Sequence, residues 1–228
     1  MKRFYKEVSV ADDLRVLLDG KPIKTPGRAT LTLPTRAMAE AVAEEWRGQG
    51  ETIIPATMKL TKLANTAIDR VAAREAEIAG QILAYANDLL CYRAAAPDEL
   101  AERQRKEWDP LLAWAAERHA PLQTRAGIGY IAQNDESLAA YRRALEAYDA
   151  FSLTALHTAA TICGSLVLAL ALAEARLDAA EAFALSQLDE RYQAEKWGAD
   201  DEAEKRARAL AAELASAARF LALARAKG

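Results

Sequence analysis

A run of 24 residues without a charged side chain, from Ala150 to Ala173, most constrains how this chain can fold. A run of that length can span a bilayer. Hydroxyl side chains and His157 dilute its first half, however, and a helical stripe at three-four spacing runs along it. The stripe consists of Leu153, Leu156, Ala160, Cys163, Val167 and Leu170. We therefore predict one buried helix at the centre of a helical domain.

The charge balance excludes several classes of partner. Charged residues make up 28% of the 228 residues, and the net charge is −3, so affinity for nucleic acid or membrane insertion is not expected. Cys91 and Cys163 both lie in apolar helical patterns, which favours buried, reduced thiols. Because the chain starts at Met1-Lys-Arg-Phe without an apolar leader, a bacterial cytoplasmic location is expected. The mitochondrial matrix is the alternative if a presequence was removed.

The first 58 residues predict a β-rich domain with one helix. Strands are expected over residues 4–10, 14–18, 21–25 and 29–33, with Asp19-Gly20 forming a hairpin turn. Thr35 is the predicted N-cap of a helix over 36–49, which carries Met38, Val42 and Trp46 on one face.

Residues 59–228 predict an all-α domain, which makes the fold class α+β with segregated elements. Helices are expected over 63–92, either long or broken, and over 98–119 with Asp98 as N-cap and a break at Asp109-Pro110. Further helices are expected over 134–148, 150–173 and 178–197, and from Asp200 or Asp201 onward. Asp178 and Glu181 fit a capping box.

No catalytic or metal-binding pattern is present in the sequence. His119 and His157 are isolated, and neither Cys163 nor Ser165 has the flanking pattern or adjacent base of a nucleophile, so we expect no metal and no cofactor. Residues 127–132 match Gly-x-Gly-x-x-Ala, but no strand–helix alternation surrounds them, as a dinucleotide site requires.

The most informative polar block spans residues 188–202. On a single helix, Glu195 lies in line with Leu185, Leu188 and Tyr192, whereas Glu190, Gln193 and Trp197 share a neighbouring face. Aromatic side chains with a few polar anchors are typical of protein-binding surfaces. The alternative is a solvated acidic helix end with Trp197 packed inward.

The chain also resembles a known family along essentially its whole length. The matching blocks cover residues 3–7, 18–26, 45–51, 58–69, 88–93, 108–114 and 188–198. The most specific are Leu-Ala-Asn-Thr-Ala-Ile-Asp at 63–69 and Tyr-Gln-Ala-Glu-Lys-Trp-Gly at 192–198. They are similar to those of the assembly chaperones for the alpha subunit of the F-type ATP synthase catalytic head, found in mitochondria and alphaproteobacteria.

The resemblance implies a non-enzymatic protein that binds the unassembled alpha subunit and masks its subunit interface until the beta subunit arrives. It implies no nucleotide, metal or small-molecule substrate. Carried onto this sequence, it makes Glu190, Gln193, Glu195 and Trp197 the candidate client-binding residues. Trp46, Asn65 and Asp69 are then assigned structural roles.

Two other functional classes remain open at this point. The first is an enzyme with an interdomain cleft that uses Glu190 or Glu195 as a general acid or base. The second is an adaptor bound permanently into a larger complex.

Overall fold

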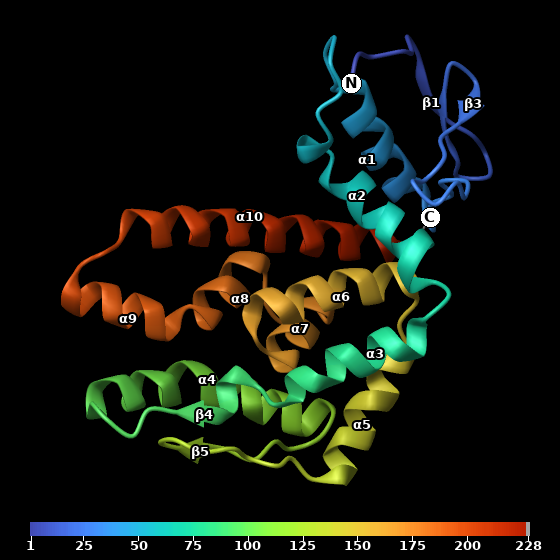
Figure 1. Ribbon diagram of the computed structural model, residues 1–228. Coiled ribbons are helices and arrows are strands. Elements are labelled where there is room, and N and C mark those ends of the chain that lie inside the picture. The colour runs from blue at the N-terminus through green and yellow to red at the C-terminus, as the bar shows by residue number, and fades with distance from the viewer. Residues whose placement is uncertain (227–228) are drawn as a thin grey trace. The chain divides into compact units, whose positions relative to one another are not determined.

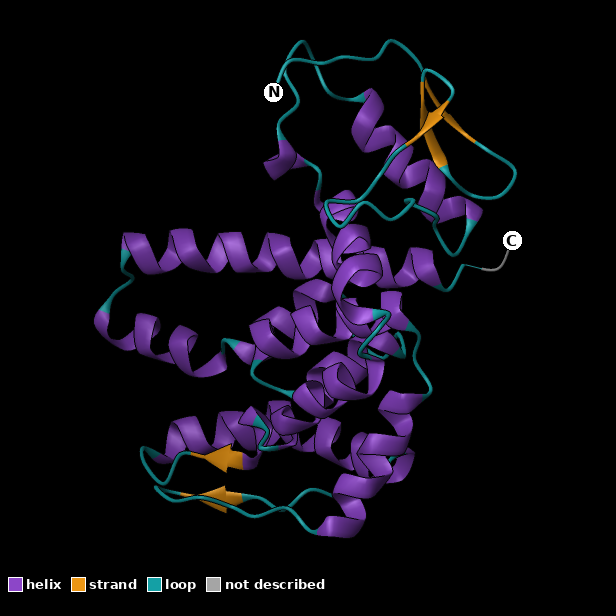
Figure 2. Ribbon diagram, turned by 45° about the vertical axis from the view of Figure 1, so that its right-hand side comes forward, coloured by secondary structure: helices purple, strands orange, loops and turns teal. Residues whose placement is uncertain are grey.

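The computed structural model describes residues 1–226, and these form two compact units (Figure 1). Unit 1 comprises residues 1–75, 148–155 and those from 219 onward; unit 2 comprises residues 76–147 and 156–218. The first unit thus continues past the division at residue 58 that the sequence suggests, and it takes in two later segments. The fold class is α+β, as predicted: a small sheet near the N-terminus and helices through most of the remaining chain (Figure 2).

Unit 1 is built from a three-stranded antiparallel sheet and two helices. The strands β1 (Val8–Val10), β2 (Val16–Leu18) and β3 (Lys21–Pro22) lie in the order β1-β2-β3. The predicted Asp19-Gly20 hairpin is confirmed, because both residues have positive φ (46° and 76°) between the paired strands β2 and β3. The predicted strand over 29–33 makes only isolated bridges at Thr30 and Thr32.

Helix α1 (Arg36–Arg47) packs against β1 and β2, and α2 (Lys59–Thr66) packs against α1. The predicted N-cap is confirmed, since the Thr35 hydroxyl accepts a hydrogen bond from the Met38 N–H (3.1 Å). A 3-10 turn (η1, Pro55–Thr57) precedes α2, and a π-helical turn (η2, Ala67–Val71) extends it. The expected helix over 63–92 is therefore broken early.

The last described residues complete the core of unit 1. Phe220 is fully buried and stacks on Phe151, with ring centroids 6.0 Å apart. The Thr35 hydroxyl donates a hydrogen bond to the Leu223 carbonyl (2.7 Å). Residues near both ends of the sequence thus share one core.

Unit 2 is helical, apart from one short strand pair. Its first part contains α3 (Glu75–Leu83), the 3-10 turns η3 (Ala84–Ala86) and η4 (Leu89–Cys91), α4 (Asp98–Arg118) and α5 (Asp135–Glu146). Strands β4 (Tyr92–Arg93) and β5 (Arg125–Ala126) pair in parallel. Its later helices are α6 (Ala150–Cys163), α7 (Leu166–Ala173), α8 (Ala179–Ser186), α9 (Leu188–Trp197) and α10 (Asp201–Ala224). Helix α6 begins in unit 1, and α10 ends in unit 1.

The prediction of one continuous uncharged helix over 150–173 is wrong. Gly164 adopts a left-handed conformation (φ 62°) between α6 and α7, and the Ser165 side chain caps α7 by accepting from the Leu168 N–H (2.9 Å). The fully buried Asp88 carboxylate accepts a further N–H of this helix start, from Val167 (2.9 Å). All eight residues of α7 are buried, and it packs against α4 and α8. No helix within residues 1–226 combines the length and hydropathy needed to cross a bilayer.

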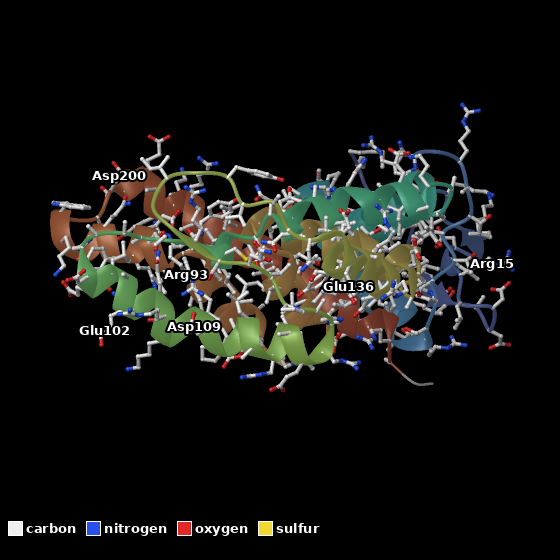
Figure 3. The ribbon with its side chains drawn as sticks, turned by 90° about the horizontal axis from the view of Figure 1, so that it is seen from below. Arg15, Arg93, Glu102, Asp109, Glu136 and Asp200 are labelled. Atoms are coloured by element: carbon white, nitrogen blue, oxygen red, sulfur yellow. The ribbon has the colours of Figure 1, made fainter. Side chains whose placement is uncertain are left out.

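The predicted break at Asp109-Pro110 is also wrong, because α4 runs through Pro110. Pro110 and Lys106, whose carbonyl loses its helical partner, are both solvent-exposed, so water can bond that carbonyl. Asp98 is the first residue of α4 rather than its N-cap. Arg93 of β4 pairs with Asp109 (2.7 Å), and the two labelled side chains lie close together in Figure 3.

Other local predictions hold. Asn134 caps α5 by accepting from the Ser137 N–H, and Asp178 and Glu181 form the capping box of α8. Residues 127–132, the rejected dinucleotide fingerprint, lie after β5, and the next helix begins only at Asp135, beyond the fingerprint.

Candidate functional site

Helix α9 carries the predicted client-binding residues, and it is held against α4. The predicted single helix over 178–197 is interrupted at Gln187, which separates α8 from α9. Leu188 and Tyr192 are buried, and Asp189 accepts a hydrogen bond from Gln104 of α4 (2.8 Å). The position of α9 is therefore fixed by both apolar packing and polar contacts with α4.

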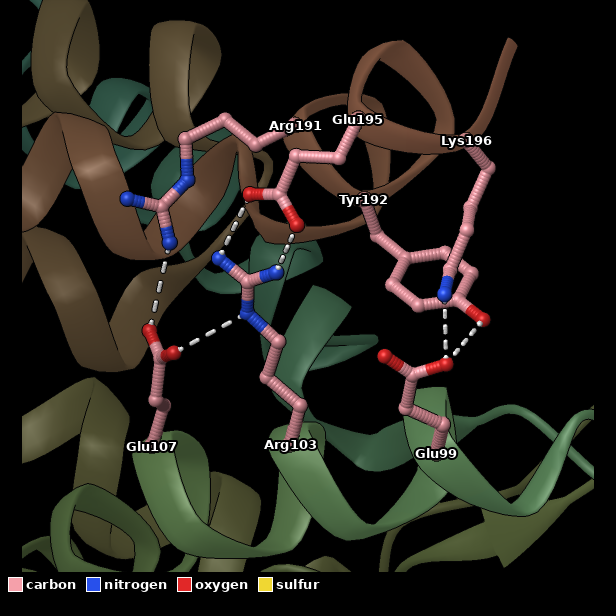
Figure 4. Close-up of polar contacts among 7 residues, drawn as sticks. All are labelled: Glu99, Arg103, Glu107, Arg191, Tyr192, Glu195 and Lys196. Atoms are coloured by element: carbon pink, nitrogen blue, oxygen red, sulfur yellow. Dashed lines mark hydrogen bonds and ion pairs between the residues drawn. The ribbon is translucent and has the colours of Figure 1, made fainter.

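Glu195 is engaged by an arginine of α4 (Figure 4). Arg103 donates two hydrogen bonds to its carboxylate (Nη1–Oε2 2.7 Å and Nη2–Oε1 3.1 Å). Paired N–H···O bonds of this kind fix the relative orientation of the two groups. Glu107 contacts both Arg103 (3.3 Å) and Arg191 (3.4 Å), which extends the network. The hydrogen bonds from Arg103 lower the pKa of Glu195, so its carboxylate is ionised at neutral pH.

A second contact group fixes the end of the helix. Lys196 pairs with Glu99 of α4 (2.7 Å), and the Tyr192 hydroxyl donates to the same carboxylate (3.3 Å) (Figure 4). The hydrogen bond from Lys196 lowers the pKa of Glu99, and the Lys196 pKa is raised in turn. Exposed ion pairs contribute little stability individually. Together, the contacts of Glu195, Tyr192 and Lys196 with α4 determine which face of α9 points toward α4 and which face remains open.

An apolar groove runs between α8, α9 and α10 on another face of α9. Its volume is about 560 Å³, and nine of its fifteen lining residues are alanine. Phe183 of α8 and Ala194 of α9 contribute to its wall, and Glu190, Arg191 and Glu204 add charged groups. Small side chains leave such a groove open to an apolar segment of another protein.

The structure separates the four predicted residues into two sets. Glu190 lines the groove, while Gln193 and Trp197 are solvent-exposed, and none of the three has a polar side-chain partner within residues 1–226. Trp197 is 78% exposed, so the interpretation in which it packs inward is wrong. Glu195 instead faces α4. Leu185 belongs to α8, so it does not continue the α9 face as expected.

The geometry gives no support to an enzyme that uses Glu190 or Glu195. A general acid at neutral pH needs a raised pKa, whereas Arg103 lowers that of Glu195. Within the described residues, no group of three or more His, Cys, Asp or Glu side chains is arranged to hold a metal ion.

The three residues with predicted structural roles all lie in unit 1. The Asp69 carboxylate accepts hydrogen bonds from the Thr25 hydroxyl (2.6 Å) and the Gly27 N–H (2.7 Å). Any side chain at Gly27 would meet that carboxylate, because a Cβ there would lie 2.6 Å from its Oδ1. Trp46 is partly buried, packs edge-on against Tyr5 and accepts the Tyr5 hydroxyl at its carbonyl (2.7 Å). Asn65 is partly buried on α2.

Sequence reasoning missed three polar residues that organise these units. The Glu45 carboxylate accepts the N–H groups of Leu60 (2.7 Å) and Thr61 (2.8 Å) at the start of α2. Asp88 does the same for α7 by accepting the Val167 N–H, whereas Arg103 orients α9 by donating to the side chain of Glu195. Glu45 and Asp88 lie in blocks that carry the family resemblance, which was a usable signal, whereas Arg103 lies outside every such block.

Known proteins match this chain in both sequence and structure. A family model described as "ATP12 chaperone protein" matches residues 2–116. The crystal structure of Atp12 from Paracoccus denitrificans is 42% identical, with 98% of each chain covered and a TM-score of 0.94. The Atu1473 protein from Agrobacterium tumefaciens is also 42% identical, with 96% of this chain and 84% of that one covered and a TM-score of 0.91.

A more distant match is the mitochondrial protein atp12 of Schizosaccharomyces pombe, which is 25% identical over 219 residues. That alignment covers 89% of this chain and 75% of the fungal protein. With a family model over half its length and a 42% identical relative over nearly all of it, the chain belongs to the ATP12 chaperone family, the ATP synthase assembly chaperones that its motifs resemble.

Proposed function

We propose that this chaperone binds the unassembled alpha subunit of the F-type ATP synthase catalytic head and masks its subunit interface until the beta subunit replaces it. The observation that carries the proposal is the open face of α9, where the exposed Trp197 and the unpaired Glu190 and Gln193 accompany an apolar groove. Aromatic anchors with a few polar groups around an apolar centre are typical of protein interfaces.

The mechanism is steric masking. An apolar element of the alpha subunit lies in the groove between α8, α9 and α10, where it cannot associate with another unassembled subunit. Glu190 and Gln193 supply charge and hydrogen bonding at the groove and beside it, and Trp197 extends the contact beyond the end of α9. The affinity must be moderate, because release depends on the beta subunit competing for the same surface.

Glu195 has a different part in this proposal from its three neighbours. Its carboxylate is already bonded to Arg103 (2.7 Å), so it orients α9 and can meet the client only at its edge. Replacing Glu195 with lysine would place two cations together and disturb α9 itself. Glu190 is therefore the better position for a test of binding, since reversing its charge breaks no contact within the described chain.

The proposal is tested by capture of purified alpha subunit on the immobilised chaperone. Glu190→Lys and Trp197→Ala are each expected to weaken binding at least about 10-fold, the loss typical of interface anchors. Glu146→Lys is the matched control, because it makes the same charge change at an exposed position of α5, away from the groove. Circular dichroism and the melting temperature would establish that each variant is folded.

Undiminished capture by both folded variants would overturn the assignment of this surface. The isolated beta subunit should release bound alpha subunit from the wild-type chaperone. A complex that retains alpha despite excess beta would instead favour the permanent adaptor.

A further inference from the structure

Unit 1 contains a hollow that the proposed function does not use. Its volume is about 830 Å³, and it lies between the β3 region, α1 and α2. Ile23, Ile53 and Met58 supply apolar walls, and Trp46 and Asn65 line it as well. A second hollow of about 440 Å³ shares Ile23 and Trp46 with the first, so the two are neighbours.

Two buried polar atoms at this hollow have no hydrogen-bond partner within the described residues. One is the indole N–H of Trp46, a donor, and the other is the side-chain oxygen of Asn65, an acceptor. Buried polar groups are normally satisfied, so each exception calls for an explanation. Both atoms belong to residues that line the hollow, so a small side-chain rotation would offer one donor and one acceptor to the C=O and N–H of a peptide backbone.

The charges around the hollow are positive and available. Lys62 and Arg70 line it, both are exposed, and neither has an ion-pair partner within residues 1–226. The lining carboxylate, Asp69, is already bonded through both oxygens to Thr25 and Gly27. With Lys24, the lining holds three cations against this one carboxylate, so its net charge is positive, and a complementary segment carries Asp or Glu.

We propose that this hollow binds an extended segment of a partner protein in which apolar and acidic residues alternate. Its apolar side chains lie among Ile23, Ile53 and Met58, its backbone bonds the Trp46 N–H and the Asn65 oxygen, and its carboxylates pair with Lys62 and Arg70. Alternation suits the site because successive side chains of an extended peptide point to opposite sides. The proposal is independent of the α9 surface, which lies in unit 2.

The test is a titration of the full-length, ¹⁵N-labelled protein, followed at its tryptophan indole N–H resonances. The acidic peptide is a capped hexamer of alternating Leu and Glu, and the control peptide has Lys in place of Glu. The Trp46 resonance, identified by its loss in Trp46→Phe, is expected to shift with the acidic peptide alone. Lys62→Glu should weaken binding of that peptide at least about 10-fold.

Lys59→Glu is the matched control, because it reverses an exposed charge on the same helix outside the hollow and should leave binding unchanged. Glu190→Lys should also leave peptide binding intact, which separates this site from the proposed client surface. The proposal is overturned if the Trp46 resonance does not respond to millimolar acidic peptide, or responds equally to the basic one. A response confined to Trp197 would overturn it too.

Discussion

Asp88 illustrates how one side chain can organise two elements. Its carboxylate is fully buried and accepts hydrogen bonds from the N–H of Leu90 (3.0 Å) in η4 and of Val167 (2.9 Å) in α7. Burial raises its pKa to about 6, because loss of hydration outweighs these hydrogen bonds. Asp88 therefore favours folding more strongly when it is protonated.

The stability of the protein should carry this titration as a pH dependence. The folded pKa of Asp88, about 6, lies above its value of about 3.9 in an unfolded chain. The stability that Asp88 contributes is therefore fully present below pH 4 and is lost as the pH rises through 6. Between pH 4 and pH 6 the free energy of unfolding should decrease by about 1.4 kcal/mol for each pH unit of increase. Asp88→Asn removes the titrating group and is the reference protein.

Urea denaturation of both proteins at several pH values measures the difference directly. Exposed carboxylates such as Glu195 are common to both proteins, so their opposite trend cancels in the comparison. The wild type should gain stability relative to Asp88→Asn as the pH falls from 7 to 4. A difference that is constant with pH would contradict the prediction.

At the scale of helices and strands, local capping signals predict several helix starts, whereas apolar periodicity does not predict the helix breaks. Thr35, Asn134 and the Asp178–Glu181 pair act as caps through neighbours within three residues, so the sequence alone predicts them. The break between α6 and α7 combines two local features that the apolar stripe concealed, Gly164 and the Ser165 cap, with a contact from Asp88, 79 positions away from Val167. Periodicity carries no information about such a contact.

Gly164→Ala should destabilise the protein by about 1–2 kcal/mol, because its left-handed backbone (φ 62°) disfavours any side chain. Gly80→Ala is the matched substitution: Gly80 lies inside α3, and an added Cβ there would meet nothing within 4 Å. The Gly80→Ala substitution should stabilise the protein by about 0.5–1 kcal/mol. Thermal unfolding of both variants checks the pair, and equal effects would contradict the assigned helix break.

At the scale of the whole molecule, the α+β class and the open face of α9 were predictable, whereas the partners of its residues were not. Glu190, Gln193 and Trp197 remain exposed, as an interface interpretation of that block expects. Glu195 differs because its partner, Arg103, lies 92 positions earlier in the chain. Only the packing of α9 on α4 brings the two together.

The organisation of unit 1 predicts that a chain ending at Ala218 loses its fold at the β-rich end. It would lack the buried Phe220 and Leu221 and the hydrogen bond from Thr35 to Leu223. Loss of a buried Phe side chain alone costs about 3–5 kcal/mol. The Trp46 indole resonance should collapse to a random-coil position, while that of the buried Trp108 persists.

A chain ending at Ala226 keeps all of these contacts and serves as the control. A native Trp46 resonance in the shorter chain would contradict the prediction.

Because residues from 219 onward belong to unit 1, synthesis of this unit is completed only after residues 76–218 have been made. A ribosome adding about 5–20 residues per second needs roughly 7–30 s to pass from residue 75 to residue 219. Throughout that interval the β-rich end lacks Phe220 and exposes the apolar surface that this residue will cover. The newborn chaperone is therefore itself vulnerable to misassociation until its last helix emerges.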